Sequence, residues 1–194
     1  MSAQVLPESF YDRDVVEVAR ALLGMRLVHR LDGQRVSGII LETEAYRGEA
    51  DLACHARAGR TPRTTVMYGP PGRAYIYFTY GMHWLLNCVC QPEGFPAAVL
   101  LRAVAPLEGQ EQMQARRAGQ PPHLWSNGPG KLCQAFGITG ALNGCSLSDP
   151  TGELFIEAGQ PVPENMVKTM PRVGISSVPE PWLSMPWRFV AQSD

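Results

Sequence analysis

The sequence lacks the features that mark membrane, secreted and metal-stapled proteins. No apolar run among its 194 residues approaches the roughly 20 residues of a membrane-spanning helix. Residues 1–8 contain neither the basic region nor the apolar region of a secretory signal peptide. The five cysteines are an odd number without a metal-binding motif, which favours reduced thiols over a disulfide framework. We therefore expect a cytoplasmic protein with no membrane contact, no bound metal and no other cofactor.

Lysine is also scarce, because Lys131 and Lys168 are the only two in the chain. The basic residues between positions 52 and 107 are all arginines: Arg57, Arg60, Arg63, Arg73 and Arg102. With Glu93 as its single acid, this stretch has a net charge of +4 in a chain whose net charge is −1. Arginine binds phosphate in two-pronged geometry, so the stretch indicates a phosphate-bearing partner. A solvated, arginine-rich loop is the alternative.

The length and the 45% apolar content fit one domain spanning residues 1–194. Apolar periodicity and turn residues predict strands at 25–30, 34–46, 73–79, 83–90, 97–105, 153–158, 172–176 and 187–191. They predict helices at 12–24, capped by Asp12 or Asp14, and at 108–118. This mixture indicates an α+β protein. Tyr80, beside Gly81 between two strands, is expected at the tip of a projecting hairpin.

Two carboxylates share one face of an expected strand. With a period of two, Ile40, Glu42, Glu44 and Tyr46 point to the same side. Carboxylates in such apolar surroundings need partners or acquire raised pKa values, and Arg102 in a later strand is a candidate partner. The pattern predicts a catalytic role for at least one glutamate. The spacing does not choose between them, and solvated surface carboxylates are the alternative.

Histidine and tyrosine side chains accompany the carboxylates. His55 alone is more typical of a structural histidine, and with the two glutamates and Asp51 it would suggest a metal cluster. The sequence contains no HExxH motif or close histidine pair to support such a cluster. Tyr75 and Tyr77 share a strand face, and Tyr80 follows at the hairpin tip. Such residues form stacking platforms and wedges for nucleic-acid bases, unless they are ordinary core aromatics.

The segment Gly128–Gln134 is typical of a glycine-rich turn that enters a helix. Free N–H groups at a helix start bind anions, and Lys131 lies in this turn. Lys131 is not followed by the Ser or Thr of a Walker loop. A phosphate contact and a plain helix start therefore explain the segment equally well.

In these motifs the chain closely resembles the alkyladenine (3-methyladenine) DNA glycosylase family. The resemblance covers nearly the whole chain in order, and Glu-Thr-Glu-Ala-Tyr together with Tyr-Gly-Met is its most specific part. The matching residues are Leu22–Gly24, Glu42–Tyr46, Asp51–His55, Arg60–Arg63, Met67, Pro71–Gly72, Tyr75–Met82, Asn87, Val99–Ala103, Gly128–Gln134 and Pro171–Gly174.

The resemblance implies a curved, mostly antiparallel sheet flanked by short helices, with a protruding hairpin. It implies that Glu44 is the general base that activates water. Arg102 and the main-chain carbonyl of Val173 would help to position that water.

The resemblance also implies a pocket for a flipped base. Its stacking residues would be Tyr46, His55 and Tyr77, and the backbone amide of His55 would read the edge of the base. Asn87 would discriminate against the extra amino group of guanine. Tyr80 would fill the gap left in the duplex. Further DNA contacts are expected from Arg63, Met67 and Lys131.

The implied activity is that of a monofunctional DNA glycosylase in base excision repair. It would flip and excise alkylated purines, and deaminated or etheno purines, from damaged double-stranded DNA and leave an abasic site. It would act as a monomer in a bacterial-type cytosol, associated with the nucleoid. An amine nucleophile needs a lowered pKa, and neither lysine has surroundings that would lower it, so water is expected instead. A non-catalytic binder of damaged or structured nucleic acid and a carbohydrate glycosidase using Glu42 and Glu44 are the alternatives.

Overall fold

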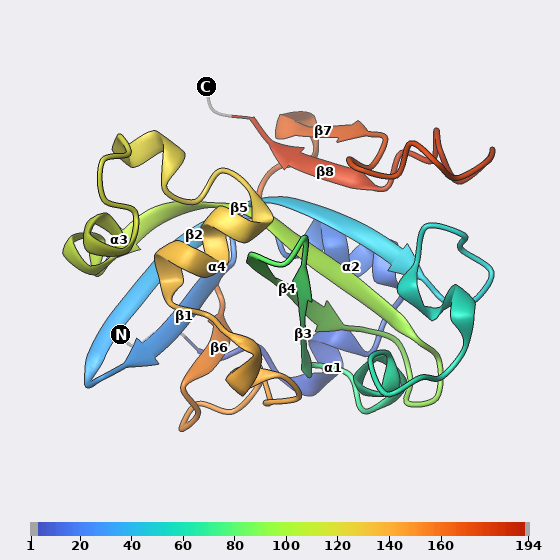
Figure 1. The fold of residues 1–194 in the computed structure, drawn as a ribbon, viewed down its shortest axis with the longest axis horizontal. Coiled ribbons are helices and arrows are strands. Elements are labelled where there is room, and N and C mark those ends of the chain that lie inside the picture. The colour runs from blue at the N-terminus through green and yellow to red at the C-terminus, as the bar shows by residue number, and fades with distance from the viewer. Residues whose placement is uncertain (1–3, 193–194) are drawn as a thin grey trace.

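A computed structural model describes residues 4–192, so the first three residues of the stretch searched for a signal peptide lie outside the described residues. Within 4–192, eight strands form one sheet in the order β3-β4-β5-β2-β1-β6, and β8 pairs with both β2 and β7 (Figure 1). Every strand pairing in it is antiparallel. The prediction of an α+β fold with a mostly antiparallel sheet is confirmed.

The strands are β1 (Arg26–Leu31), β2 (Gln34–Arg47), β3 (Ala74–Thr79), β4 (His83–Val89), β5 (Ala97–Glu108), β6 (Leu154–Glu157), β7 (Val167–Met170) and β8 (Arg188–Ala191). The α-helices are α1 (Glu8–Tyr11), α2 (Val15–Ala21), α3 (Gln110–Arg116) and α4 (Pro129–Phe136). The 3₁₀ helices are η1 (His55–Ala58), η2 (Thr65–Tyr68), η3 (Pro122–Leu124), η4 (Gly140–Leu142) and η5 (Glu164–Met166). Among the described residues, each helix is too short or too polar to cross a lipid bilayer.

The helices are shorter than predicted. Of the two capping candidates for α2, Asp14 is the cap, because its side chain accepts a hydrogen bond from the Val16 amide at 2.9 Å. Strand β5 continues to Glu108, so α3 begins only at Gln110, after the left-handed Gly109. Figure 1 shows α2 behind β2 and β5, whereas α4 lies on the viewer's side.

Strand β2 is bulged in the middle, where it carries the two glutamates. Its register with β5 shifts between Ile40 and Glu42 and again between Glu42 and Thr43. Ile40 belongs to the main apolar core, and Thr43 Oγ1 donates a hydrogen bond to the Ala19 carbonyl of α2 at 2.7 Å. The prediction that Ile40 shares a face with Glu42 and Glu44 is therefore wrong, because a bulge interrupts the period of two. Beyond the bulge, Glu44 points away from α2.

Strands β3 and β4 form the predicted hairpin. Thr79 pairs with His83, and the three residues between them make the turn. Tyr80 and Gly81 both have positive φ angles, 52° and 66°, a conformation that glycine adopts freely and tyrosine rarely does. The Tyr80 side chain is 84% exposed at this tip. The hairpin therefore presents a large aromatic ring to solvent.

The C-terminal region differs from its prediction. The prediction of a strand at residues 172–176 is wrong, because β7 lies earlier in the chain. The chain after Pro171 is irregular, and Gly174 has a φ of 78°. Proline has no N–H for a strand ladder, and the Arg172 side chain is buried against Asp51. The strands expected at 153–158 and 187–191 are confirmed as β6 and β8. Strand β8 pairs with β2 from Glu42 to Glu44, and the irregular segment before β8 reaches Glu44 through the Val173 amide.

Candidate active site

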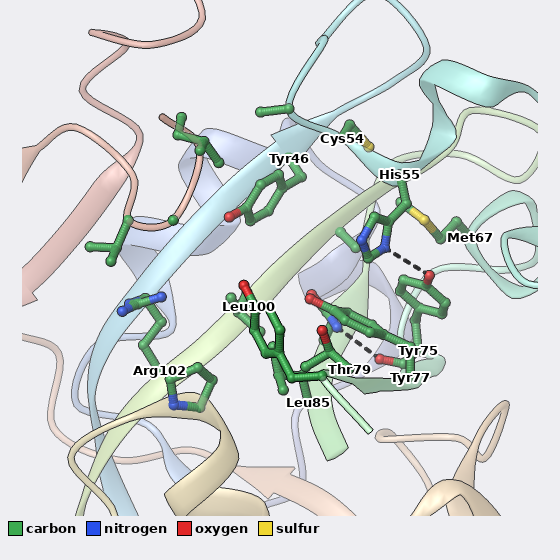
Figure 2. Close-up of a pocket in the computed structure, with 18 residues that line it drawn as sticks. Tyr46, Cys54, His55, Met67, Tyr75, Tyr77, Thr79, Leu85, Leu100 and Arg102 are labelled. Carbon is green, nitrogen blue, oxygen red and sulfur yellow. Dashed lines mark hydrogen bonds between the residues drawn. The ribbon is translucent and has the colours of Figure 1, made fainter. Parts of the chain in front are cut away.

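A cavity of about 330 Å³ opens where the middle of the sheet meets the loops after β2 and β7. This volume lies at the lower end of the range for small-molecule sites. Figure 2 shows aromatic rings and Arg102 around it. Its lining includes the predicted Tyr46, His55, Met67, Tyr77, Tyr80, Asn87, Arg102 and Val173, and also Ala53, Cys54, Tyr75, Thr79, Leu85, Ala98, Leu100, Pro129, Gly174 and Ile175.

Glu44 lies directly behind the cavity wall, and its side chain is fully buried. Its Oε2 accepts hydrogen bonds from the Tyr46 hydroxyl at 2.8 Å and from Arg102 Nη1 at 3.3 Å. Its Oε1 accepts one from the Val173 amide at 2.7 Å. Burial raises the pKa of Glu44 above its ordinary value of 4.5, although Arg102 and the two other donors act in the opposite direction. A carboxylate offers about four acceptor positions, so these three donors leave one acceptor position free.

Glu42 has a different environment, which separates the two glutamates. Its Oε1 accepts a hydrogen bond from Arg102 Nε at 2.8 Å, and Arg188 Nε lies 3.2 Å from the same oxygen. Its side chain is 19% exposed. The expected partnership of Arg102 with the glutamates is confirmed, and Arg102 connects both carboxylates. Glu42 therefore holds Arg102 from one side while Glu44 accepts from the other.

Aromatic rings form the opposite wall. His55 Nδ1 lies 3.0 Å from the Tyr75 hydroxyl, and the His55 ring packs edge-to-face on Tyr77 with centroids 4.5 Å apart (Figure 2). Burial, helped by the charges of Arg63 and Arg57, lowers the pKa of His55 to about 4. Burial also raises the pKa of Tyr77 above its ordinary range. At neutral pH these rings are therefore uncharged and present π faces to the cavity.

Asn87 approaches the cavity from β4. Its side chain is almost fully buried, and Nδ2 donates a hydrogen bond to the Tyr75 carbonyl at 3.0 Å. This bond holds the amide group in a fixed orientation. Asn87 is therefore a rigid polar group in a largely aromatic and aliphatic lining.

The predicted DNA contacts lie in different settings. Tyr80 stands at the cavity mouth, and the Arg63 guanidinium lies 4.9 Å from the centroid of the Tyr77 ring. Lys131 lies in the first turn of α4, and its Nζ donates a hydrogen bond to Asn127 Oδ1 at 3.0 Å. Pro129 of the same turn lines the cavity. Met67 is buried in a small apolar cluster beneath the cavity rather than on an open surface.

Sequence reasoning missed several residues that shape the site. Tyr75 anchors His55 and Asn87, although the pattern indicated only that it shares a face with Tyr77. Arg188 was missed because no local pattern connects β8 to Glu42. The metal cluster considered for His55 does not form: Asp51 pairs with Arg172, and among residues 4–192 no three His, Cys, Asp or Glu side chains gather as metal ligands would.

Comparison with known proteins decides the family, since the model of methylpurine-DNA glycosylase (MPG) matches residues 9–194. The chain belongs to the methylpurine-DNA glycosylase family. A Methanocella arvoryzae protein named "Putative 3-methyladenine DNA glycosylase" is 50% identical over 186 residues, which are 95% of this chain and 91% of its own length. Proteins of the same name from Myxococcus xanthus and Chlamydia abortus are 49% and 47% identical, over 94% and 96% of this chain and 88% and 97% of their own lengths.

Membership in this family makes the protein a DNA glycosylase, a hydrolase that acts on DNA in repair. The family resemblance predicted from the motifs is thereby confirmed. This family membership excludes both alternatives, a non-catalytic nucleic-acid binder and a carbohydrate glycosidase.

Proposed function

We propose that this methylpurine-DNA glycosylase is monofunctional and excises alkylated purines, and also deaminated or etheno purines, by water attack on the N-glycosidic bond. The observation that carries the proposal is the buried Glu44 carboxylate, held by Tyr46, Arg102 and the Val173 amide beside an aromatic cavity. A base-sized cavity next to a restrained carboxylate is what excision of a flipped nucleotide requires.

Base flipping accounts for the aromatic lining and the exposed hairpin tip. Extruding a nucleotide costs a few kcal/mol, and stacking on aromatic side chains returns about 1–3 kcal/mol per base. Tyr46, His55 and Tyr77 would stack on the flipped base. Tyr80, which is 84% exposed, would enter the minor groove as a wedge and fill the vacated space.

Glu44 would act as the general base. It would take a proton from water, whose oxygen bonds to the sugar carbon C1′ as the bond from C1′ to the purine nitrogen breaks. The bonding electron pair leaves with the purine, and the carboxylate stabilises the oxocarbenium-like sugar. Arg102 and the Val173 carbonyl would position the water. The acceptor position that the three donors leave free on Glu44 supports this role.

The cavity suits purines whose alkylation gives them positive charge. Such bases leave readily, and uncharged π faces attract a cationic ring. At neutral pH His55 supplies such a face, because its pKa is about 4. The backbone amide of His55, at the start of η1 where N–H groups lack intrahelical partners, would read the edge of the base. Asn87 would discriminate against the amino group of guanine.

The positions of the two lysines support water as the nucleophile. Lys131 is bound to Asn127, Lys168 lies on β7, and neither lines the cavity. Arg63 and Lys131 would complete the contacts to damaged double-stranded DNA, whereas the buried Met67 would meet DNA only at the flipped nucleotide, in the cavity that it lines. We further propose that residues 1–194 act as one domain and as a monomer, in a cytosol where the protein meets the nucleoid.

The test is an excision panel on duplex DNA containing 3-methyladenine, 7-methylguanine, hypoxanthine or ethenoadenine, followed by product analysis. We expect free base, an intact abasic strand and no covalent adduct after borohydride treatment. Trapping in good yield that disappears in Lys131→Ala would overturn the water mechanism. Failure to release any of the four bases would overturn the substrate proposal.

A further inference from the structure

Asp51 and Arg172 form an ion pair whose two side chains are completely buried. Arg172 Nη1 and Nη2 lie 2.5 Å and 2.9 Å from the two carboxylate oxygens. Removing two charges from water is costly, and a buried ion pair is weak evidence for stability by itself. Neither side chain lines the cavity, and the chemistry proposed above uses neither. The pair therefore requires another explanation.

Asp51 fixes the loop that leads to His55. Besides Arg172, its carboxylate accepts hydrogen bonds from the Arg47 amide at 3.1 Å and from the Ala53 amide at 3.0 Å. Ala53 and His55 both line the cavity. The position of the His55 wall therefore depends on this carboxylate.

Arg172 fixes the opposite side of the site. Its guanidinium lies 4.8 Å from the centroid of the Tyr46 ring and 5.2 Å from that of Trp187, and Nη1 donates to the Ala45 carbonyl at 2.9 Å. The next residue, Val173, donates its amide hydrogen to Glu44. Arg172 therefore contacts the ring of Tyr46, whose hydroxyl donates to Glu44, and holds the backbone that carries the second donor, the Val173 amide.

We propose that Asp51 and Arg172 are a positioning pair for the glycosylase reaction: they hold Tyr46 and the Val173 amide against Glu44, in register with the His55 wall. The inference rests on the proposed function, since it takes Glu44 as the base. Breaking the pair should therefore alter the chemistry at Glu44, and not only the stability of the fold.

The main test variant is the double substitution Asp51→Asn/Arg172→Gln, which removes both charges together and leaves no unpaired buried charge. Arg172→Lys is the second variant, because it keeps the charge but loses the two-pronged contact. Arg102, Glu42 and Arg188, the other charged groups around Glu44, are unchanged in both. The readouts apply to whichever variant folds.

The first readout is the titration of the Glu44 carboxyl by ¹³C NMR in the full-length protein without DNA. Hydrogen bonds to the charged form of a carboxyl lower its pKa, so a displaced Val173 amide should move the Glu44 titration to higher pH. The second readout is single-turnover excision of hypoxanthine. It should fall by about 10- to 100-fold, as small displacements of reacting groups do, and its acid limb should move to higher pH.

Glu157→Gln is the matched control. It removes the negative charge from a buried contact with Arg35, 2.7 Å long, between strands β2 and β6 away from the cavity. It should lower the unfolding temperature and leave the Glu44 titration and the excision rate unchanged. A folded test variant with the wild-type titration and rate would overturn the positioning role. If the wild-type protein excises nothing, the proposed function fails, whereas the NMR titration still decides whether the pair positions Glu44.

Discussion

Replacement of Glu44 by glutamine is the sharpest test of the proposed chemistry. Glutamine keeps the size of the side chain but cannot take a proton from water. General acid–base catalysis contributes about 10²- to 10⁴-fold, which corresponds to roughly 3–5 kcal/mol of activation free energy. We expect single-turnover excision to fall by at least the lower figure, while binding to lesion-containing duplex is kept.

The structure also predicts a stability effect of the same substitution. Glu44 accepts hydrogen bonds at both oxygens, from Val173 at one and from Tyr46 and Arg102 at the other. A glutamine amide has only one oxygen, so its NH₂ group must face the Val173 amide or the Arg102 guanidinium, and both are donors. An unmet buried donor costs about 1–3 kcal/mol, although removal of a buried charge offsets part of this cost. Only a small change in unfolding temperature is therefore expected.

The assay is single-turnover release of ethenoadenine with enzyme in excess, together with duplex binding and thermal unfolding of both proteins. A rate loss with intact binding and folding isolates the chemical step. A loss of less than tenfold would show that Glu44 is not the base. If the variant unfolds at the assay temperature, the loss of rate is a stability effect. Repeating the assay at a lower temperature separates this effect from one on the chemical step.

Three further predictions follow. Glu42→Gln should lower the free energy of unfolding by about 1–3 kcal/mol, because it weakens the contact to Arg102, and should change the excision rate less than tenfold. A loss of excision as complete as that of Glu44→Gln would mean that the roles of the two glutamates are assigned wrongly. Tyr80→Ala should weaken capture of the flipped state more than duplex affinity, as measured with a fluorescent base analogue and with Phe78→Ala as the exposed hairpin control; an unchanged flipping equilibrium would remove the wedge role. Burial raises the pKa of Glu44 above 4.5, so below that pKa the proposed base is protonated and inactive. Excision of 7-methylguanine should therefore rise about tenfold per pH unit below the pKa and level off above it, and a rate independent of pH from 4 to 7 would contradict the mechanism.

The sheet was predictable because its signals are local. Alternating apolar residues and the Asp32-Gly33 turn specify the β1–β2 hairpin. The bulge at Glu42 was not predictable, because it depends on how β2 pairs with β5 about 60 residues later in the chain. The irregular course of residues 172–176 was missed for a similar reason. There the buried contact between Arg172 and Asp51, 121 residues away in sequence, overrides the strand pattern.

The candidate site shows the same limit at the level of single hydrogen bonds. The donors to Glu44 come from residues 2, 58 and 129 positions away in sequence. Tyr46 shares the strand period with Glu44, and Arg102 was a candidate because a buried carboxylate needs a cation. The Val173 amide is a backbone group, so no side-chain pattern could indicate it. Because burial alone would favour the protonated, inactive carboxyl, this donor helps to keep Glu44 ionised. The proposed role of Glu44 as a general base therefore requires a distant segment to be folded against its strand, and holding that segment is the role proposed above for the Asp51–Arg172 pair.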